Sequence, residues 1–91
     1  MRITKVRIVR LDGETRLAFA EITLDDCFRV RGLEIVRHQG GVAVKMPEAK
    51  LKGGVIGEVA FALNAQTRRM IEDAVIVEYE KVARRRNGRS R

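Results

Sequence analysis

Apolar and polar residues alternate with a period of two over much of the first two thirds of the chain. In the stretch KVRIV, which begins at Lys5, the apolar Val6 and Ile8 alternate with the basic Lys5 and Arg7. This alternation is typical of a strand with one buried face and one solvated face. Strands predicted on this ground cover Ile3–Leu11, Arg16–Leu24, a segment that begins near Phe28, Val42–Met46 and Val55–Leu63.

Turn-forming residues separate these strands. They are Asp12-Gly13, Asp25-Asp26 and the segment His38–Gly41. Asp and Gly are favoured at such places because they tolerate the backbone conformations that tight turns need. Within the third strand, the apolar positions change phase between Val30 and Leu33. A glycine at such a phase shift, here Gly32, indicates a β-bulge.

The character of the chain changes after the last predicted strand. Asn64 is a good N-cap residue, and Ala65–Ala83 contains neither Gly nor Pro, so a helix is predicted there. The expected fold is therefore of the α+β class, with a small antiparallel sheet of about five strands followed by a C-terminal helix. Residues 1–83 are expected to form a single domain, and residues 84–91 a basic, disordered tail.

The apolar face of the predicted helix is wider than one sheet requires. One stripe is extended by neighbouring apolar residues; the stripe is Ile71, Val75, Tyr79 and Val82, and the extension is Met70, Ala74 and Val77. A domain of 91 residues also buries only a modest core. Both features favour a homodimer with the helix at its interface. The alternative is a helix packed deeply against a curved sheet.

The net charge is +7. A charge of this size favours a polyanionic partner, either nucleic acid or an anionic membrane surface, although a soluble basic protein without such a partner has the same charge. The chain contains no Trp and few aromatic residues, so no platform for stacking unpaired bases is evident. No apolar run is long enough to span a bilayer, and no membrane association is expected.

Residues able to support catalysis are scarce. His38 is the only histidine and lies beside a turn, so it is expected to be a surface residue. Cys27, the only cysteine, is expected to be a buried or half-buried structural thiol, and its single occurrence fits a reducing cytoplasm. The chain is therefore not expected to be an enzyme, to bind a metal or cofactor, or to act on a small-molecule substrate.

Two groups of basic residues are candidates for phosphate contacts. Lys50 and Lys52 lie in a glycine-rich loop, KLKGG, whose flexibility would let the lysines reach phosphates. Arg68 and Arg69 lie in the first turn of the predicted helix, where free backbone N–H groups already favour anions. The alternative is that these arginines are exposed and paired with Glu72 or Asp73 at helical spacing.

Two longer stretches resemble a known family. ITLDDCFRVRGLEIVRHQGGVAVKMP, at residues 22–47, is similar to the central region of the stage V sporulation protein G (SpoVG) family, and NAQTRRMIEDAVIVEY, at residues 64–79, is similar to its helix. The matching positions are Thr23-Leu24-Asp25, Phe28, Gly41-Val42-Ala43-Val44, Met46-Pro47, Thr67-Arg68, Ile71, Ala74-Val75 and Glu78-Tyr79.

The resemblance implies a homodimer that binds DNA, and RNA as well, and that regulates gene expression linked to sporulation and septation. Carried onto this sequence, the family's binding regions fall on Lys50 and Lys52 in the loop and on Arg68 and Arg69 in the helix. A protein-interaction module of cell division or septation, without direct nucleic-acid binding, is the alternative.

Overall fold

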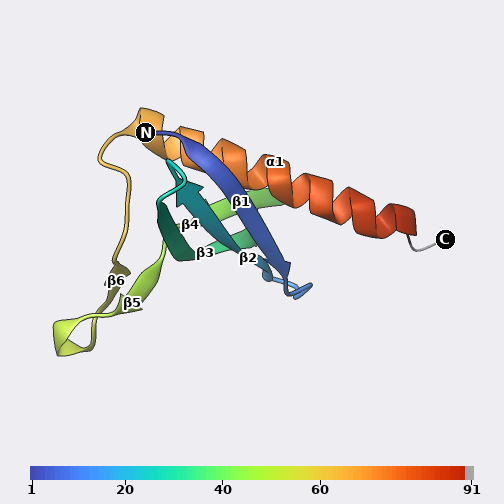
Figure 1. Cartoon of the computed structure of the whole chain (residues 1–91). Coiled ribbons are helices and arrows are strands. Elements are labelled where there is room, and N and C mark those ends of the chain that lie inside the picture. Colours follow the sequence, from blue (N-terminus) through green and yellow to red (C-terminus); the bar gives the residue numbers. More distant parts are fainter. Residues whose placement is uncertain (90–91) are drawn as a thin grey trace.

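A four-stranded antiparallel sheet forms the body of the protein. The computed structural model describes residues 1–89, and side chains as far as residue 85. The sheet consists of β1 (Ile3–Arg10), β2 (Arg16–Leu24), β3 (Phe28–His38) and β4 (Gly41–Lys45), arranged in that order. Each strand pairs with the one that follows it in sequence, so the sheet is a simple meander (Figure 1). The α+β class expected from the sequence is confirmed.

Tight turns set the register of this meander. Between β2 and β3, Asp25 and Asp26 both have positive φ, and the Cys27 N–H donates to the Leu24 carbonyl at 3.0 Å. Gln39 and Gly40 have positive φ between β3 and β4. Two consecutive positive φ values define the hairpin turn whose twist matches that of the strands. The turns predicted at these positions are therefore confirmed.

A β-bulge interrupts β3 where the apolar pattern changes phase. Ala20 of β2 lies opposite Leu33, whereas Ile22 lies opposite Val30, so β3 holds one extra residue between these pairs. Gly32 sits in the extra segment with a φ of 89°. The extra residue turns Leu33 back toward the core after the shift. The predicted bulge at Gly32 is confirmed.

The long helix α1 (Ala65–Arg89) covers one face of the sheet and contacts β1, β2 and β4 (Figure 1). Val75 on the helix is completely buried, and Ile71 is nearly so. Ala18 and Ala20 lie on the covered side of β2, and their small side chains let the helix approach the sheet closely. The core is aliphatic; its buried members are Leu17, Ala18, Ala20, Ile22, Leu33, Ile35, Val44, Met46, Ile71 and Val75.

The predicted fifth strand, Val55–Leu63, is wrong in extent and in position. Residues after Met46 form a separate two-stranded sheet, in which β5 (Glu48–Lys50) pairs with β6 (Ile56–Glu58). A strand needs a partner for its backbone N–H and C=O groups, and β5 provides one over three residues only. Beyond β6 the chain is irregular, and the alternation at Val59, Phe61 and Leu63 does not produce a strand.

The helix also ends later than predicted. It continues past Ala83 to Arg89, so the backbone of residues 84–89 is helical rather than a disordered tail. Arg and Lys are good helix formers, and no proline follows Asn64 to stop the helix. Residues 90–91 of the predicted tail lie outside the described residues, and the domain boundary near residue 83 stays a prediction.

The backbone conformation at Gly32 should be costly for any other residue. Gly32→Ala should lower the free energy of unfolding by about 1–2 kcal/mol, since a left-handed conformation costs a residue with a Cβ about that much. Gly41→Ala is the matched control, because Gly41 does not have positive φ and its added Cβ would meet nothing closer than 3.8 Å. Urea unfolding followed by circular dichroism compares the two, and equal losses would contradict the role given to Gly32.

Candidate nucleic-acid interface

A short arm projects from the body of the protein and carries the loop lysines. The arm consists of β5, the 3₁₀ turn η1 (Lys52–Gly54) and β6, and it extends away from the main sheet and from α1 (Figure 1). Gly53 and Gly54 both have φ near 84°, and they allow the chain to reverse direction between the strands. At the base of the arm, the Val59 N–H donates to the Pro47 carbonyl at 2.9 Å.

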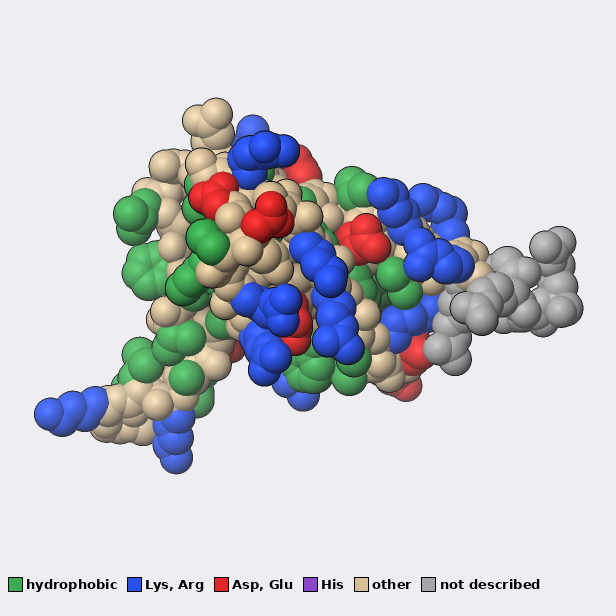
Figure 2. Space-filling model, viewed as in Figure 1, with side chains coloured by type: hydrophobic (Ala, Val, Ile, Leu, Met, Phe, Trp, Pro, Cys, Tyr) green, Lys and Arg blue, Asp and Glu red, His purple; other side chains and the backbone are tan. Residues whose placement is uncertain are grey.

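Lys50 and Lys52 are exposed near the outer end of this arm. Figure 2 shows basic side chains at the tip with no acidic side chain beside them on the visible face. Within the part of the chain whose side chains are described, neither lysine forms an ion pair. The arm therefore presents two free ammonium groups to solvent, at a distance from the body.

The start of α1 is capped as predicted. The Thr67 N–H donates to the Asn64 side-chain oxygen at 2.7 Å, and the Arg68 N–H donates to the Asn64 carbonyl at 3.1 Å. Asn64 is therefore an N-cap residue that satisfies one of the free donors of the first turn. No acidic residue lies in that turn to offset the positive end of the helix.

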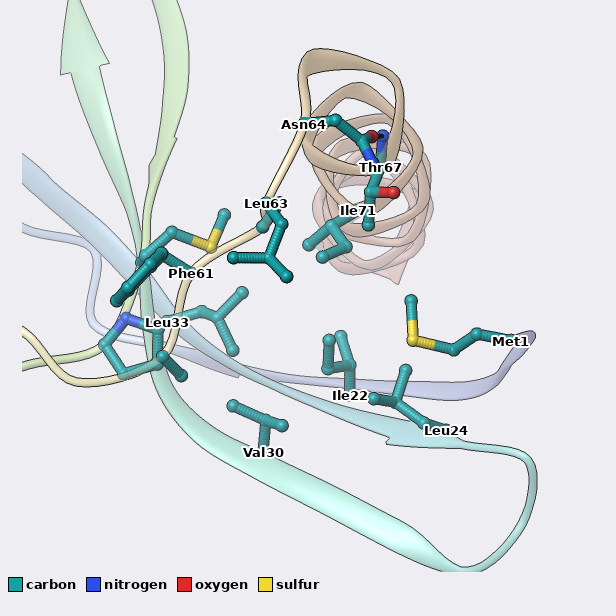
Figure 3. Close-up of a pocket in the computed structure, with 14 residues that line it drawn as sticks. Met1, Ile22, Leu24, Val30, Leu33, Phe61, Leu63, Asn64, Thr67 and Ile71 are labelled. Atoms are coloured by element: carbon teal, nitrogen blue, oxygen red, sulfur yellow. Dashed lines mark hydrogen bonds between the residues drawn. The ribbon is translucent and has the colours of Figure 1, made fainter.

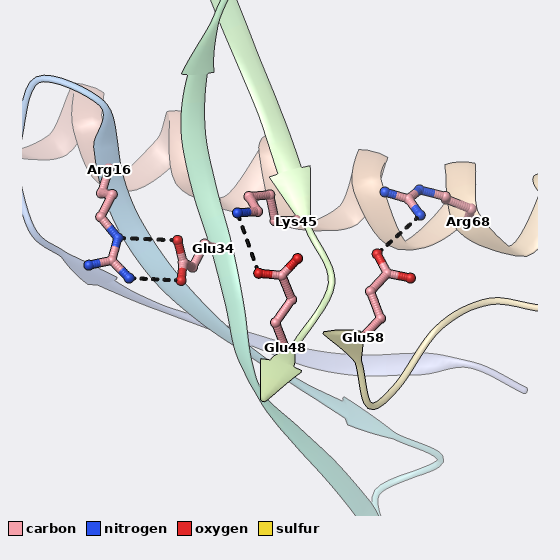
Figure 4. Close-up of polar contacts among 6 residues, drawn as sticks. All are labelled: Arg16, Glu34, Lys45, Glu48, Glu58 and Arg68. Atoms are coloured by element: carbon pink, nitrogen blue, oxygen red, sulfur yellow. Dashed lines mark hydrogen bonds and ion pairs between the residues drawn. The ribbon is translucent and has the colours of Figure 1, made fainter. Parts of the chain in front are cut away.

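The two arginines of this first turn differ in their surroundings. The Arg68 guanidinium contacts Glu72 at 3.0 Å. It also contacts Glu58, at the end of β6, at 3.9 Å (Figure 4). Pairing with Glu72 is the alternative raised from helical spacing, and it holds for Arg68. Arg69 is exposed and has no ion pair among the side chains that the structure describes. An incoming phosphate would compete with two carboxylates for Arg68 and with none for Arg69.

Within one chain, the structure does not bring the loop lysines and the helix arginines together. The arm tip points away from the start of α1, and the irregular segment after β6 leads back to the helix (Figure 1). Only the base of the arm, through Glu58, reaches Arg68. A single site made of all four residues would need a second subunit or a ligand long enough to span both places.

The structure reveals a third group of basic residues that the sequence analysis missed. Lys5, Arg7, Arg29 and Arg31 all lie on the face of the main sheet that α1 does not cover. The signal was present in the alternation of the KVRIV stretch and of the FRVR stretch at residues 28–31. The sequence does not show the register of the sheet. That register places β1 and β3 on either side of β2, so that these four residues share one face.

An apolar groove opens between the sheet, the start of α1 and the segment that precedes it. Its volume is about 430 Å³, and side chains from these three parts point into it (Figure 3). Ile22, Leu33 and Ile71 form its inner side. Phe61 and Leu63, from the connecting segment, also line it and are 58% and 90% exposed. Much apolar surface therefore remains in contact with water on this side of the molecule.

One ion pair on the open sheet face is well formed. Arg16 donates to both carboxylate oxygens of Glu34, at 3.3 and 3.0 Å (Figure 4). The Arg16 guanidinium also lies over the Phe19 ring, 5.7 Å from its centre. The hydrogen bond from Arg16 lowers the pKa of Glu34 from its ordinary value; partial burial opposes this, and the charges of Arg16 and Lys45 add to it.

The two residues considered for chemistry are both at the surface. His38 is exposed at the end of β3, as predicted. Cys27 is a free, exposed thiol after the turn at Asp26, so the expected burial of this residue is wrong. The tight turn at Asp25-Asp26 places Cys27 at the end of the β2–β3 hairpin, outside the buried core. In residues 1–89, no helix combines the length and the apolar character needed to cross a bilayer.

Comparison with known proteins places this sheet-and-helix domain in a class of bacterial proteins. The model of the SpoVG family matches residues 1–81, and the chain belongs to the SpoVG family. A relative from Bdellovibrio bacteriovorus, named "Putative septation protein SpoVG", is 40% identical over 89% of this chain and 75% of its own length. Relatives from Anaeromyxobacter sp. (strain Fw109-5) and Caldicellulosiruptor bescii carry the same name. They are 36% and 37% identical, over 93% and 90% of this chain and 88% and 94% of their own lengths.

The Arg16–Glu34 pair should make stability depend on pH in one direction. The pKa of Glu34 is lower in the folded protein than its ordinary value of 4.5. Ionised Glu34 therefore contributes to the free energy of unfolding above pH 4.5, and this contribution is lost as the pH falls through the folded-state pKa. Glu34→Gln should therefore be less stable than the wild type at about pH 7, and the difference should shrink as the pH falls below the ordinary pKa of 4.5 and through the lowered folded-state value. Urea unfolding over this range measures it, and a difference that does not change with pH would contradict the assignment.

Proposed function

We propose that this protein is a nucleic-acid-binding regulator of the SpoVG type, acting in the cytoplasm as a homodimer on DNA and also on RNA. The observation that carries the proposal is the exposure of cations at two projecting places, Lys50 and Lys52 on the arm and Arg69 at the helix start. The net charge of +7 supports a polyanionic partner. The names of its relatives link the proposed regulation to septation, and the family name links it to sporulation.

The proposed contacts are to phosphates rather than to base edges. Lysine is a flexible point charge that reaches phosphate oxygens without reading sequence. Arginine on a helix has less freedom to lose, and its planar fork matches a phosphate. The first turn of α1 adds backbone N–H groups and a partial positive charge to the same place. Affinity should therefore depend strongly on salt and weakly on sequence.

Alanine substitutions should rank these contacts. Arg69→Ala should weaken binding to random-sequence duplex DNA by about 1–2 kcal/mol, and Lys50→Ala or Lys52→Ala by less than about 1 kcal/mol. Arg68→Ala should fall between them, because Arg68 must first leave Glu58 and Glu72. Each phosphate interaction that is removed should reduce the magnitude of the log–log salt slope by about 0.9.

Fluorescence anisotropy at several salt concentrations gives both quantities. Cys27→Ser and His38→Ala are the controls, and each should change the affinity by less than about twofold, or roughly 0.4 kcal/mol. Binding by the wild type that does not weaken with salt would contradict phosphate recognition. If the wild type binds an acidic protein but no nucleic acid, the alternative of a protein-interaction module in septation is favoured instead.

The homodimer is supported by the apolar surface left exposed. Val77 on α1 is 51% exposed, although it belongs to the apolar extension of the helical stripe. On the arm, Val55 and Ile56 are more than half exposed, and a two-stranded hairpin alone is only marginally stable in water. A second subunit that covers these residues would stabilise the arm and would place loop lysines of one chain nearer the helix of another.

Sedimentation should therefore give about twice the chain mass of 10.3 kDa at micromolar concentration. Val77→Glu should shift the protein toward monomer if α1 lies at the interface, and Leu63→Glu should do so if the groove lies there. Both side chains are exposed, so neither change should unfold the subunit, and circular dichroism checks this. A wild-type protein that sediments as a monomer would contradict the proposal.

A further inference from the structure

The uncovered face of the main sheet carries a compact group of cations. Lys5 and Arg7 are successive outward residues of β1, and Arg29 and Arg31 belong to β3. All four are exposed. Figure 2 shows basic side chains gathered over the strands, with little acidic surface between them. Charges of one sign on one face repel one another and usually lower stability. Their gathering here therefore favours the binding of an anionic ligand.

The register shows how the group is built. Lys5 lies opposite Thr23, which in turn lies opposite Arg29, so these residues form one row across three strands. In the next row, Arg7 lies opposite Glu21. Outward residues on one strand are about 6.6 Å apart, and neighbouring strands are about 4.8 Å apart. The four cations and the Thr23 hydroxyl therefore occupy an area about the size of a few nucleotides.

Glu21 is the one acidic residue among these two rows. Its carboxylate contacts the Arg31 guanidinium at 3.3 Å, while the Arg31 side chain is 72% exposed. An exposed pair of this kind is weak, and a phosphate can take the place of the carboxylate. Four cations against one carboxylate leave this face positive even with the pair formed.

We propose that this uncovered face, through Lys5, Arg7, Arg29 and Arg31, is a second phosphate-binding surface that holds the backbone of a nucleic acid. The inference rests on the proposed function and adds a surface that the arm and the helix start do not include. Arginine forks and the Thr23 hydroxyl are suited to phosphate oxygens. The two rows carry no apolar side chain that could enter a membrane, which favours nucleic acid over a lipid surface.

The same face offers little for base stacking. Phe19, one of few aromatic residues in the chain, is an outward residue of β2, but the Arg16 guanidinium lies over its ring. Arg16 is itself held by Glu34. Bases therefore have no free aromatic platform there, and the surface should prefer a duplex backbone to an unstacked single strand.

Charge changes in opposite directions test the proposal. The double variants Lys5→Ala/Arg7→Ala and Arg29→Ala/Arg31→Ala should each weaken binding to random-sequence duplex DNA by about fivefold or more and lower the salt slope by about 0.9 for each phosphate interaction removed. Glu21→Gln should strengthen binding by about twofold, because it removes the carboxylate of these two rows and releases Arg31. Lys81 is exposed on α1, which covers the other face of the sheet, so Lys81→Ala is the matched control. This substitution should change the affinity by less than about twofold.

The outcomes separate this inference from the proposed function. Wild-type protein that binds no nucleic acid overturns both. Binding that is weakened in Arg69→Ala but unchanged in the two double variants and in Glu21→Gln overturns the second surface alone. Binding to vesicles of anionic lipid, with no binding to DNA or RNA, and with weaker vesicle binding in the double variants, would assign this face to a membrane and also overturn the inference.

A measurement on the wild type guards against variants that do not fold. Backbone amide NMR resonances of β1 and of β3 should shift when a short DNA duplex is added. The resonances of the two β-strands should shift over the same range of duplex concentration. Shifts confined to the arm and to the first turn of α1 would show that the uncovered face does not take part, and the inference would be wrong.

Discussion

A four-stranded sheet has two faces, and this chain has one helix to cover them. The contact of α1 with β1, β2 and β4 buries Val75 completely, along with Leu33 and Ile35 of β3. Burial of such aliphatic side chains contributes about 1.5–3 kcal/mol each. Among residues 1–85, the buried side chains form a single core. Everything else in the structure is arranged around this one-sided contact.

The first consequence is that the other face of the sheet is free to be polar. Strand alternation places Val6 and Ile8 against the core and turns Lys5 and Arg7 outward. The bulge at Gly32 keeps β3 consistent with this division, since it restores the inward direction of Leu33 after the outward Arg31. Covering the sheet on one side only thus leaves the other face free to carry the cations Lys5, Arg7, Arg29 and Arg31.

The second consequence is that residues 48–63, which follow the core residue Met46 and Pro47 and lead to α1, stay outside the core. Residues 48–58 form an arm with its own short ladder, and the following segment crosses to the start of the helix with Phe61 and Leu63 exposed. The helix start then faces outward with Arg69 unpaired among the described side chains. The arm carries exposed apolar residues, Val55 and Ile56, beside its free lysines, so positive charge and apolar surface meet there.

Local patterns in the sequence determined the parts whose physical causes are local. The turns at Asp25-Asp26 and before Gly41, the bulge at Gly32 and the Asn64 cap all follow from backbone preferences of single residues, and each is where the sequence indicated. The resemblance to SpoVG, later shown by comparison, depended likewise on short matching stretches. Only the tertiary structure decided the pairing of β5 with β6, the exposure of Cys27 and the assembly of Lys5, Arg7, Arg29 and Arg31 on one face. These depend on which strand finds which partner, and that choice is made by hydrogen bonding and burial between residues distant in the chain, which alternation along one strand does not encode.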